Sequence, residues 1–311
     1  MNKTIKQALD QFGLDGSESI RLIGGANTWE IDGKLILKSY STNKDMAEKA
    51  ARLNALLHQE NAPVAKIHLT KTADFCASTE GSYYTLANKL SGIAGQDVYE
   101  GDSKKRVYSM GRSLAKLHLA MQKIDGKVEL WDNNIIDELN GWILKEIQEK
   151  QIPVRPEVIQ YCIDFADLYH HLPRQIIHRD PHSGNMCIEN NEVTGIYDFD
   201  LCQINSRVFD LHYAFGPNEE NFDKWLMLRP YFFSGYHEVS PISKDEMAAY
   251  TYMSVLIDLL FVAFWSTQNR IDKPVDEVLK CVHWMYDKRN EIAIHEKHLS
   301  MKGYISTRLP K

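Results

Sequence analysis

Apolar residues change their spacing near residue 91, and this change restricts how the chain can fold. Between residues 20 and 90 they occur in short alternating runs, which are typical of β-strands. After a break at Ser91-Gly92 and Ala94-Gly95 they recur every three or four residues, which is typical of helices. The sequence therefore predicts an α+β fold with a small β-rich lobe over residues 1–90 and a larger, mainly helical lobe over residues 91–311.

Local signals place the elements of the N-terminal lobe. An amphipathic helix is expected within the first 14 residues. Two strand-like runs between residues 20 and 40 are joined by Asp32-Gly33, a dipeptide that favours the tight turn of a β-hairpin. The other elements expected before residue 91 are one helix and two short strands, at residues 44–58, 65–69 and 83–90.

The C-terminal lobe has one β-like exception to its helical pattern. Between residues 175 and 201, the apolar runs MCI and GIYDF flank Asn190-Asn191, so we expect a small hairpin there. Long helical patterns resume afterwards, over residues 245–267 and 275–296.

The charge balance does not suit a nucleic-acid-binding protein. The chain has a formal net charge of -6 and a pI near 6.1, whereas nucleic-acid-binding domains usually carry a basic excess. The compact basic run Lys104-Lys105-Arg106 is interpreted as a solvated helix face. We therefore expect no nucleic-acid partner, and the sequence indicates no oligomeric state.

The cysteines and the apolar segments bear on the cellular compartment. The five cysteines are scattered, with neither disulfide-framework nor zinc-ligand spacing, so free thiols in a reducing compartment are expected. The N-terminus lacks the apolar core of a signal peptide. The most apolar stretch, Val255 to Trp265, is half a membrane span long and contains Asp258, which favours a buried helix. We expect a cytoplasmic protein with no membrane partner.

A polar segment in the C-terminal lobe has the composition that phosphoryl transfer requires. This reaction needs a carboxylate beside the attacking hydroxyl and oxygen ligands that hold magnesium against the phosphates. Magnesium takes few protein ligands, prefers hard oxygen donors and keeps several waters. The segment supplies such groups in His178-Arg179-Asp180-Pro181-His182-Ser183-Gly184-Asn185 and, beyond the predicted hairpin, in Asp198-Phe199-Asp200.

The pattern H-x-D-x-H-x-G-N, followed by this second acidic segment, resembles the aminoglycoside phosphotransferase and choline kinase family. The resemblance implies a two-lobed protein-kinase-like fold, with ATP or GTP as phosphate donor, Mg²⁺ as cofactor and a small-molecule hydroxyl as acceptor. It implies that Asp180 orients or deprotonates the hydroxyl, that Asn185 and Asp198 bind magnesium, and that His178 braces the loop. His182 would approach the γ-phosphate.

The resemblance extends to the N-terminal lobe, which would bind the nucleotide. Gly25, Asn27 and Thr28 lie between two strand-like runs, where backbone amides could cover the phosphates. Lys38 would bind phosphate oxygens and pair with Glu48 on the following helix, and Glu60 is a weaker candidate for that pairing. In isolation, these residues would be read as a turn, an exposed strand lysine and an exposed helix glutamate.

Other positions are assigned by the same resemblance. Ala87 and Asn88 fall in the connector between the lobes, whose backbone edge would bind the purine. Asp210 would buttress the active-site loop, and His118 would be a packing or hydrogen-bonding residue. Asp200 would either assist metal binding or stabilise the loop by a hydrogen bond. For Arg179 we expect a salt bridge to a local carboxylate such as Asp200 or Asp210.

Two alternative functions are open at this point. A protein Ser/Thr kinase is disfavoured because position 182 is His rather than Lys, no Ala-Pro-Glu motif follows Asp198, and only a short segment separates Asp198 from Asp210. A non-catalytic kinase-like binding module is disfavoured because the residues needed for catalysis are present. The acceptor stays open among sugars, amino alcohols, hydroxy amino acids and antibiotics.

Overall fold

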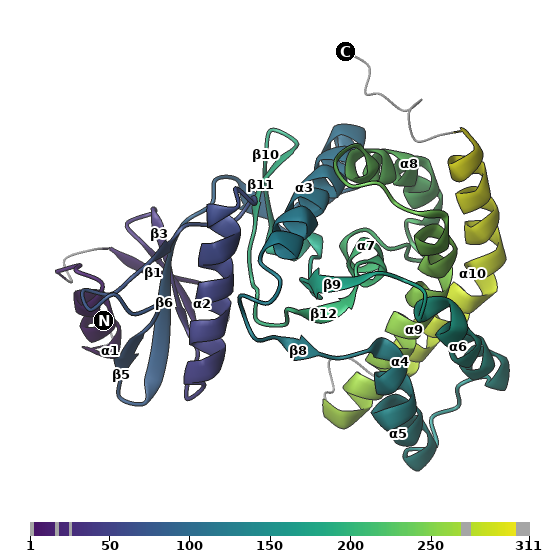
Figure 1. The fold of residues 1–311 in the computed structure, drawn as a ribbon, viewed down its shortest axis with the longest axis horizontal. Helices are drawn as coiled ribbons and strands as arrows, with labels where there is room; N and C mark the ends of the chain where they lie inside the picture. The colour runs from purple at the N-terminus through teal and green to yellow at the C-terminus, as the bar shows by residue number, and fades with distance from the viewer. Residues whose placement is uncertain (1–2, 16–18, 25–26, 269–274, 303–311) are drawn as a thin grey trace.

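The computed structural model describes residues 3–15, 19–24, 27–268 and 275–302. Figure 1 shows a β-rich N-terminal part beside a larger C-terminal part that is mainly helical. The predicted α+β class and the order of its two parts are therefore confirmed.

The N-terminal part is one antiparallel sheet with two helices. The strands run in the order β1-β2-β3-β6-β4, and β5 also pairs with β6. The bounds are Lys3–Gln11 for α1, Ile20–Gly24 for β1, Thr28–Ile31 for β2, Leu35–Ser39 for β3, Lys44–Gln59 for α2, Ile67–His68 for β4, Ala77–Thr79 for β5 and Ser82–Asn88 for β6.

The predicted hairpin is present as β2 and β3. Asp32 and Gly33 connect these strands with φ angles of 51° and 68°, the left-handed values that a tight hairpin turn needs. The register pairs Thr28 with Lys38, so the end of the turn before β2 lies beside the predicted phosphate-binding lysine.

The C-terminal part begins with the short strand β7 and the long helix α3. It contains two small three-stranded sheets, in the orders β11-β10-β7 and β8-β12-β9, and further helices. The strands are β7 (Ile93–Ala94), β8 (Trp131–Asp132), β9 (Arg174–Ile177), β10 (Met186–Glu189), β11 (Glu192–Ile196) and β12 (Gln203–Ser206). The predicted hairpin around Asn190-Asn191 is the pair β10 and β11. The helices are α3 (Ser103–Lys123), α4 (Ile135–Glu138), the π-helix η1 (Leu139–Ile143), α5 (Leu144–Glu149), α6 (Pro156–Tyr169), the 3-10 turn η2 (Ser183–Asn185), α7 (Val208–Ala214), α8 (Phe222–Val239), α9 (Lys244–Gln268) and α10 (Val275–Lys302).

Helix α9 extends well beyond the apolar stretch recognised in the sequence. Its 25 residues are long and apolar enough to cross a membrane, but 72% of the most apolar window is buried inside the structure. Nearly all of its apolar side chains pack in the large hydrophobic core, which is the arrangement expected of a central core helix.

Helices α3 and α8 approach each other backbone to backbone. A Cβ atom at Gly111 of α3 would lie 2.0 Å from the carbonyl oxygen of Phe232, and one at Gly235 of α8 would lie 2.1 Å from that of Tyr108. Such close contact requires glycine on both helices because backbone atoms cannot move aside as a flexible side chain can.

We predict that Gly111→Ala destabilises the fold by about 1–3 kcal/mol, the usual cost of forcing extra volume into a packed core. Urea unfolding of the variant measures this loss. Gly141→Ala is the matched control because a Cβ there meets nothing within 4 Å. Equal stability of the two variants would contradict the backbone contact between α3 and α8.

Candidate active site

A buried carboxylate, Asp210 at the start of α7, holds the loop that carries the predicted catalytic aspartate. Its Oδ2 accepts hydrogen bonds from the backbone N–H of His178, at 2.7 Å, and from Nε2 of His118, at 2.9 Å. Its Oδ1 accepts from the backbone N–H of Arg179 at 2.8 Å. The predicted buttress is therefore observed, and His118 is one of its hydrogen-bonding partners.

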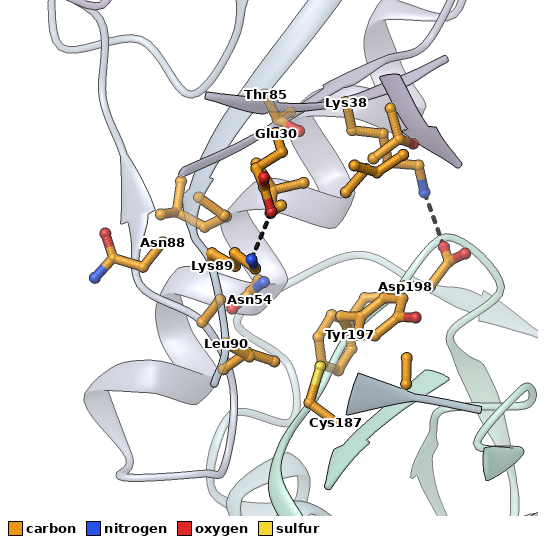
Figure 2. Close-up of a pocket in the computed structure, with 18 of the residues that line it drawn as sticks. Glu30, Lys38, Asn54, Thr85, Asn88, Lys89, Leu90, Cys187, Tyr197 and Asp198 are labelled. Atoms are coloured by element: carbon orange, nitrogen blue, oxygen red, sulfur yellow. Dashed lines mark hydrogen bonds and ion pairs between the residues drawn. The ribbon is translucent and has the colours of Figure 1, made fainter. Parts of the chain in front are cut away.

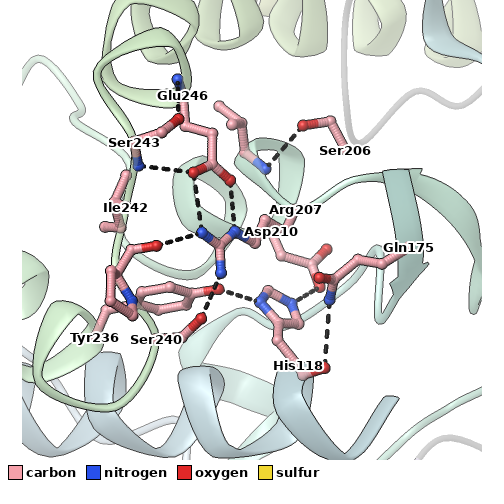
Figure 3. A network of polar contacts seen from close by, with 12 residues as sticks. His118, Gln175, Ser206, Arg207, Asp210, Tyr236, Ser240, Ile242, Ser243 and Glu246 are labelled. Carbon is pink, nitrogen blue, oxygen red and sulfur yellow. Dashed lines mark hydrogen bonds and ion pairs between the residues drawn. The ribbon is translucent and has the colours of Figure 1, made fainter. Parts of the chain in front are cut away.

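The support continues away from the loop through a chain of buried polar groups, shown in Figure 3. Nδ1 of His118 lies 2.6 Å from the hydroxyl of Tyr236. The Tyr236 ring contacts the guanidinium of Arg207, which pairs with Glu246 at 2.5 and 2.9 Å. Burial alone would raise the pKa of Glu246, but hydrogen bonds from Arg207 and Ser243 outweigh it and keep the pKa low.

The buried ring of His178 fixes the backbone of Asp180. Nε2 of this buried ring donates to the carbonyl of Tyr197 at 3.0 Å, and Nδ1 accepts the backbone N–H of Asp180 at 3.2 Å. Burial lowers the pKa of His178, so the ring is neutral and can accept and donate at the same time. Its predicted bracing role agrees with these contacts.

Asp180 and Asn185 are held together on this loop. The side-chain amide nitrogen of Asn185 donates to both the backbone carbonyl and the carboxylate of Asp180, at 2.8 and 2.9 Å. The hydroxyl of Tyr213 faces the same carboxylate. Burial raises the pKa of Tyr213, and the charge of Asp180 raises it further. Asp180 therefore has a carboxylate oriented by a neutral amide, with no cation bound directly to it among the described residues.

Lys38 reaches from β3 to the acidic segment that follows β11. Its Nζ lies 2.8 Å from Asp198 and 2.6 Å from Asp200, and the hydroxyl of Tyr40 donates to Asp200 at 3.0 Å. Figure 2 shows the contact between Lys38 and Asp198. Burial would lower the pKa of Lys38, but the charges of Tyr40, Asp200 and Asp198 together raise it. The ammonium is therefore kept charged at the mouth of the site.

Two residues of the site have left-handed backbone angles, which non-glycine residues seldom adopt. These are Arg179 with φ of 69° and Asp198 with φ of 73°. Arg179 directly precedes Asp180, and Asp198 itself carries the second carboxylate that the sequence predicts to take part in the reaction. Such angles persist only where surrounding contacts impose them, and they concentrate at functional sites.

A pocket of about 550 Å³ opens next to Lys38 and Asp198. Its walls come from β2, β3, α2, β6, the connector after β6 and the acidic segment after β11 (Figure 2). Among the predicted binding residues, those that line it are Thr28, Lys38, Ala87, Asn88 and Asp198. The structure thus brings together residues that are up to 170 positions apart, counted from Thr28 to Asp198.

Three other predicted nucleotide-binding residues, Asn27, Glu48 and His182, do not line this pocket, and Gly25 falls outside the described residues. Asn27 is an exposed turn residue whose carbonyl accepts the N–H of Ser39. His182 is 47% exposed; its Nδ1 accepts the N–H of Gly184, and its Nε2 lies 3.7 Å from Asp180.

The predicted ion pair between Lys38 and Glu48 is wrong. Glu48 is half-exposed on α2, where it pairs with Lys44 at 3.3 Å and accepts a contact from Cys76. Glu60, the weaker candidate, pairs with Lys123 and Lys127. The face of α2 that lines the pocket carries Ala50 and Ala51, so the helix offers no carboxylate there and Lys38 takes both of its partners from the acidic segment.

The connector contributes Ala87, Asn88 and Leu90 to the pocket wall. Asn88 is still part of the sheet, and its backbone N–H donates to Lys66 at 2.9 Å. The N–H of Lys89 donates to Lys34 at 2.7 Å. Within the described part of the chain, the next backbone donor, Leu90, has no acceptor. That the backbone edge of the connector binds a purine stays a prediction.

The partner predicted for Arg179 is wrong too. Its guanidinium pairs with Glu138 of α4, at 2.8 and 3.1 Å, and donates to Gln203, whereas only its backbone N–H contacts Asp210. Burial raises the pKa of Glu138, and Arg179 opposes that rise. Asp200 is engaged by Lys38 and Tyr40 of the N-terminal part, and its two predicted roles both stay predictions.

Three residues of the site were not found from the sequence: Tyr40, Glu138 and Tyr213. Tyr40 lies two positions after Lys38, on the same face of its strand, and this spacing could have suggested the contact. No sequence pattern connects Glu138 with Arg179 or Tyr213 with Asp180, because these contacts depend on how separate helices pack.

A sequence profile of the phosphotransferase enzyme family matches residues 21–250, a span that contains the pocket and both acidic segments. The chain belongs to this family. Its members are enzymes that transfer phosphoryl groups, which agrees with the lysine and carboxylate constellation described above.

Individual relatives are distant. The chain is 27% identical over 152 residues to a homoserine kinase of Neisseria meningitidis serogroup B, a match that spans 46% of this chain and about half, 48%, of that relative. A microcompartment-associated aminopropanol kinase superposes with a TM-score of 0.67 at 16% identity, over 96% of this chain and 98% of the other. An aminoglycoside phosphotransferase of Alicyclobacillus acidocaldarius gives 0.66 at 13% identity, over 94% and 96%. The structural matches establish a shared fold.

We predict that Asp210→Asn destabilises the protein by about 2–3 kcal/mol, because the new amide group would face N–H donors and leave one of them without an acceptor. Urea unfolding measures the effect. Asp164→Asn, at an exposed position of α6, is the matched control and should change stability by less than about 0.5 kcal/mol. An Asp210→Asn protein as stable as this control would show that the loop does not depend on the carboxylate.

Proposed function

We propose that this protein is a magnesium-dependent kinase that transfers the γ-phosphate of ATP or GTP to a hydroxyl group of a small molecule. The observation that carries the proposal is that Lys38 and Asp198, from separate parts of the chain, meet at one pocket, while Asn185 holds the carboxylate of Asp180 on the loop before the hairpin that leads to Asp198. In phosphoryl transfer, positioning and charge neutralisation provide most of the catalysis, and these residues supply both.

The residues present fit a magnesium ion. The amide nitrogen of Asn185 is used by Asp180, which leaves the side-chain oxygen of Asn185 available as a ligand, and the carboxylate of Asp198 is 37% exposed. Within the described residues no group of three His, Cys, Asp or Glu side chains could form a metal cage. A site with one amide and one carboxylate suits magnesium, which keeps most of its waters. When bound, the ion would neutralise charge on the phosphates.

The protein groups then have distinct tasks. Asp180 accepts the proton of the acceptor hydroxyl or aligns that hydroxyl for attack, and Asn185 and Tyr213 keep its carboxylate oriented. Lys38 holds phosphate oxygens, which would compete with Asp198 and Asp200 for its ammonium group. Residues 1–90 form the nucleotide-binding lobe in this proposal, residues 91–311 form the catalytic and acceptor lobe, and the free N–H of Leu90 contacts the purine.

A small acceptor is favoured over a protein acceptor by the segment between Asp198 and Asp210. Strand β12 and the start of α7 occupy most of this segment. A long loop that docks a peptide has no room there. Relatives named for homoserine and aminopropanol share an acceptor with a hydroxyl and an amino group. Hydroxy amino acids and amino alcohols are therefore the first acceptors to test, together with sugars and aminoglycosides.

We predict that Asp180→Asn lowers acceptor-dependent turnover by roughly 100-fold or more, the usual contribution of a positioned acid–base group. Nucleotide affinity should change little because Asp180 does not line the pocket. A coupled assay of nucleotide turnover with the acceptor panel measures the first effect, and calorimetric titration measures the second. Unchanged turnover would remove Asp180 from the mechanism.

Asp198→Ala should instead weaken the binding of magnesium–ATP, because the variant loses a metal ligand. Lys38 keeps Asp200 as a partner in this variant, so the lysine is not left unpaired. The comparison to make is nucleotide affinity with Mg²⁺ and with EDTA. A loss of affinity seen only with Mg²⁺ supports a metal ligand, and equal affinities of variant and unsubstituted protein in Mg²⁺ would exclude that role.

A further inference from the structure

Helix α2 presents one polar side chain to the nucleotide pocket, and that side chain is Asn54. The residues beside it on this face, Ala50 and Ala51, are small and apolar and line the same pocket. Asn54 is only 8% exposed, so its amide is largely shielded from solvent. Figure 2 shows it on the same side of the pocket as Lys89 and Leu90.

The amide oxygen of Asn54 is buried without a hydrogen-bond partner among the described residues. Buried polar side-chain atoms are normally paired, and an unpaired one at a pocket wall indicates a group that a ligand satisfies. The charged and amide groups nearby are already engaged. Glu30 pairs with Lys89 at 2.5 Å and with Arg21 at 2.8 Å, and the side-chain oxygen of Asn88 lies 2.6 Å from His68.

The connector indicates how a purine would face this amide. The N–H of Leu90 has no acceptor within the described residues, so it can donate to a ring nitrogen of the purine. In a purine, N1 is adjacent to C6. Ala87, Leu90 and Asn54 all line this pocket. We infer that a base that accepts from Leu90 through N1 turns its 6-substituent toward Asn54, past the small side chain of Ala87.

The chemistry of the amide distinguishes the two common purines. A side-chain amide pairs with adenine by accepting from the 6-amino group and donating to N7. Guanine has an oxygen at position 6 and a nitrogen acceptor at N7, so an amide meets an acceptor with its own oxygen in either orientation. We propose that Asn54 is a specificity-determining residue that recognises the 6-amino edge of adenine and, together with the N–H of Leu90, from which guanine N1–H cannot accept, makes ATP the preferred donor over GTP. This inference rests on the proposed kinase function.

A structural role would give Asn54 different properties. A buried amide that stabilises the helix or the sheet would hydrogen-bond to protein groups, and its replacement by Leu would lower stability. An amide reserved for a ligand has no such partner. We therefore expect Asn54→Leu to be at least as stable as the unsubstituted protein, as judged by its thermal unfolding midpoint.

The decisive experiment compares nucleotides that differ at one position of the base. Calorimetric titrations in Mg²⁺, without acceptor, give the affinities for ATP, GTP and purine riboside triphosphate, which lacks the 6-amino group. The unsubstituted protein should bind ATP about tenfold or more tightly than either of the others. In Asn54→Leu the affinities for ATP and purine riboside triphosphate should fall within about threefold of one another, whereas GTP should remain the weaker ligand because its N1–H faces the N–H of Leu90. Asn140→Leu, at an exposed position of η1, is the matched control and should keep the preference for ATP.

Each result has a separate meaning. If the unsubstituted protein binds ATP and GTP equally, or if Asn54→Leu keeps the preference for ATP over purine riboside triphosphate, the inference is overturned while the kinase function stands. If neither nucleotide binds the unsubstituted protein, the proposed function itself fails. If Asn54→Leu does not fold, Asn54→Ala replaces it in the same titrations, and retention there of the preference for ATP over purine riboside triphosphate would overturn the inference equally.

Discussion

The site depends on one buried carboxylate. Asp210 accepts three hydrogen bonds, two of them from consecutive backbone N–H groups, and so fixes the path of the chain immediately before Asp180. Hydrogen bonds to a charged acceptor in a dry interior are stronger than neutral ones. The left-handed backbone of Arg179 can persist because the N–H of this residue is held there. The carboxylate of Asp180, which we propose as the catalytic group, is thereby positioned by Asp210.

A second constraint connects the two parts of the molecule. Lys38 belongs to the N-terminal sheet, whereas Asp198 and Asp200 follow the hairpin of the C-terminal part, and the ion pairs between them cross the pocket entrance. Because α2 offers alanines where a carboxylate could have paired with Lys38, the lysine is tied to the acidic segment alone. In the proposed function, phosphate oxygens and these carboxylates would compete for one ammonium group, so nucleotide binding would be coupled to the position of the acidic segment.

The sequence was most informative where chemistry and local geometry fix the residues. As predicted, Asp180 and Asn185 share one short loop, and Asp198 follows the hairpin formed by β10 and β11. The sequence was least informative about which side chains of a helix contact distant parts of the chain. Glu48 was assigned to Lys38 from its position in the chain, yet it is half-exposed and pairs with Lys44. The helical period instead turns Asn54, four residues after Ala50, toward the pocket. Attention to that period would have found the correct face of α2, although not what an amide does there.

By itself the sequence determined the α+β class, the hairpins at Asp32-Gly33 and Asn190-Asn191, and the loop that we propose for phosphoryl transfer, because periodicity, turn chemistry and a compact motif are local properties. Only the tertiary structure decided the partners of Lys38 and Arg179, the start of the free connector edge at Leu90 and the exposure of Asn54 to the pocket. These depend on how the sheet, α2 and α4 pack against distant segments. Contacts between residues far apart in the chain are set by the packing of the whole core, which no short stretch of sequence encodes.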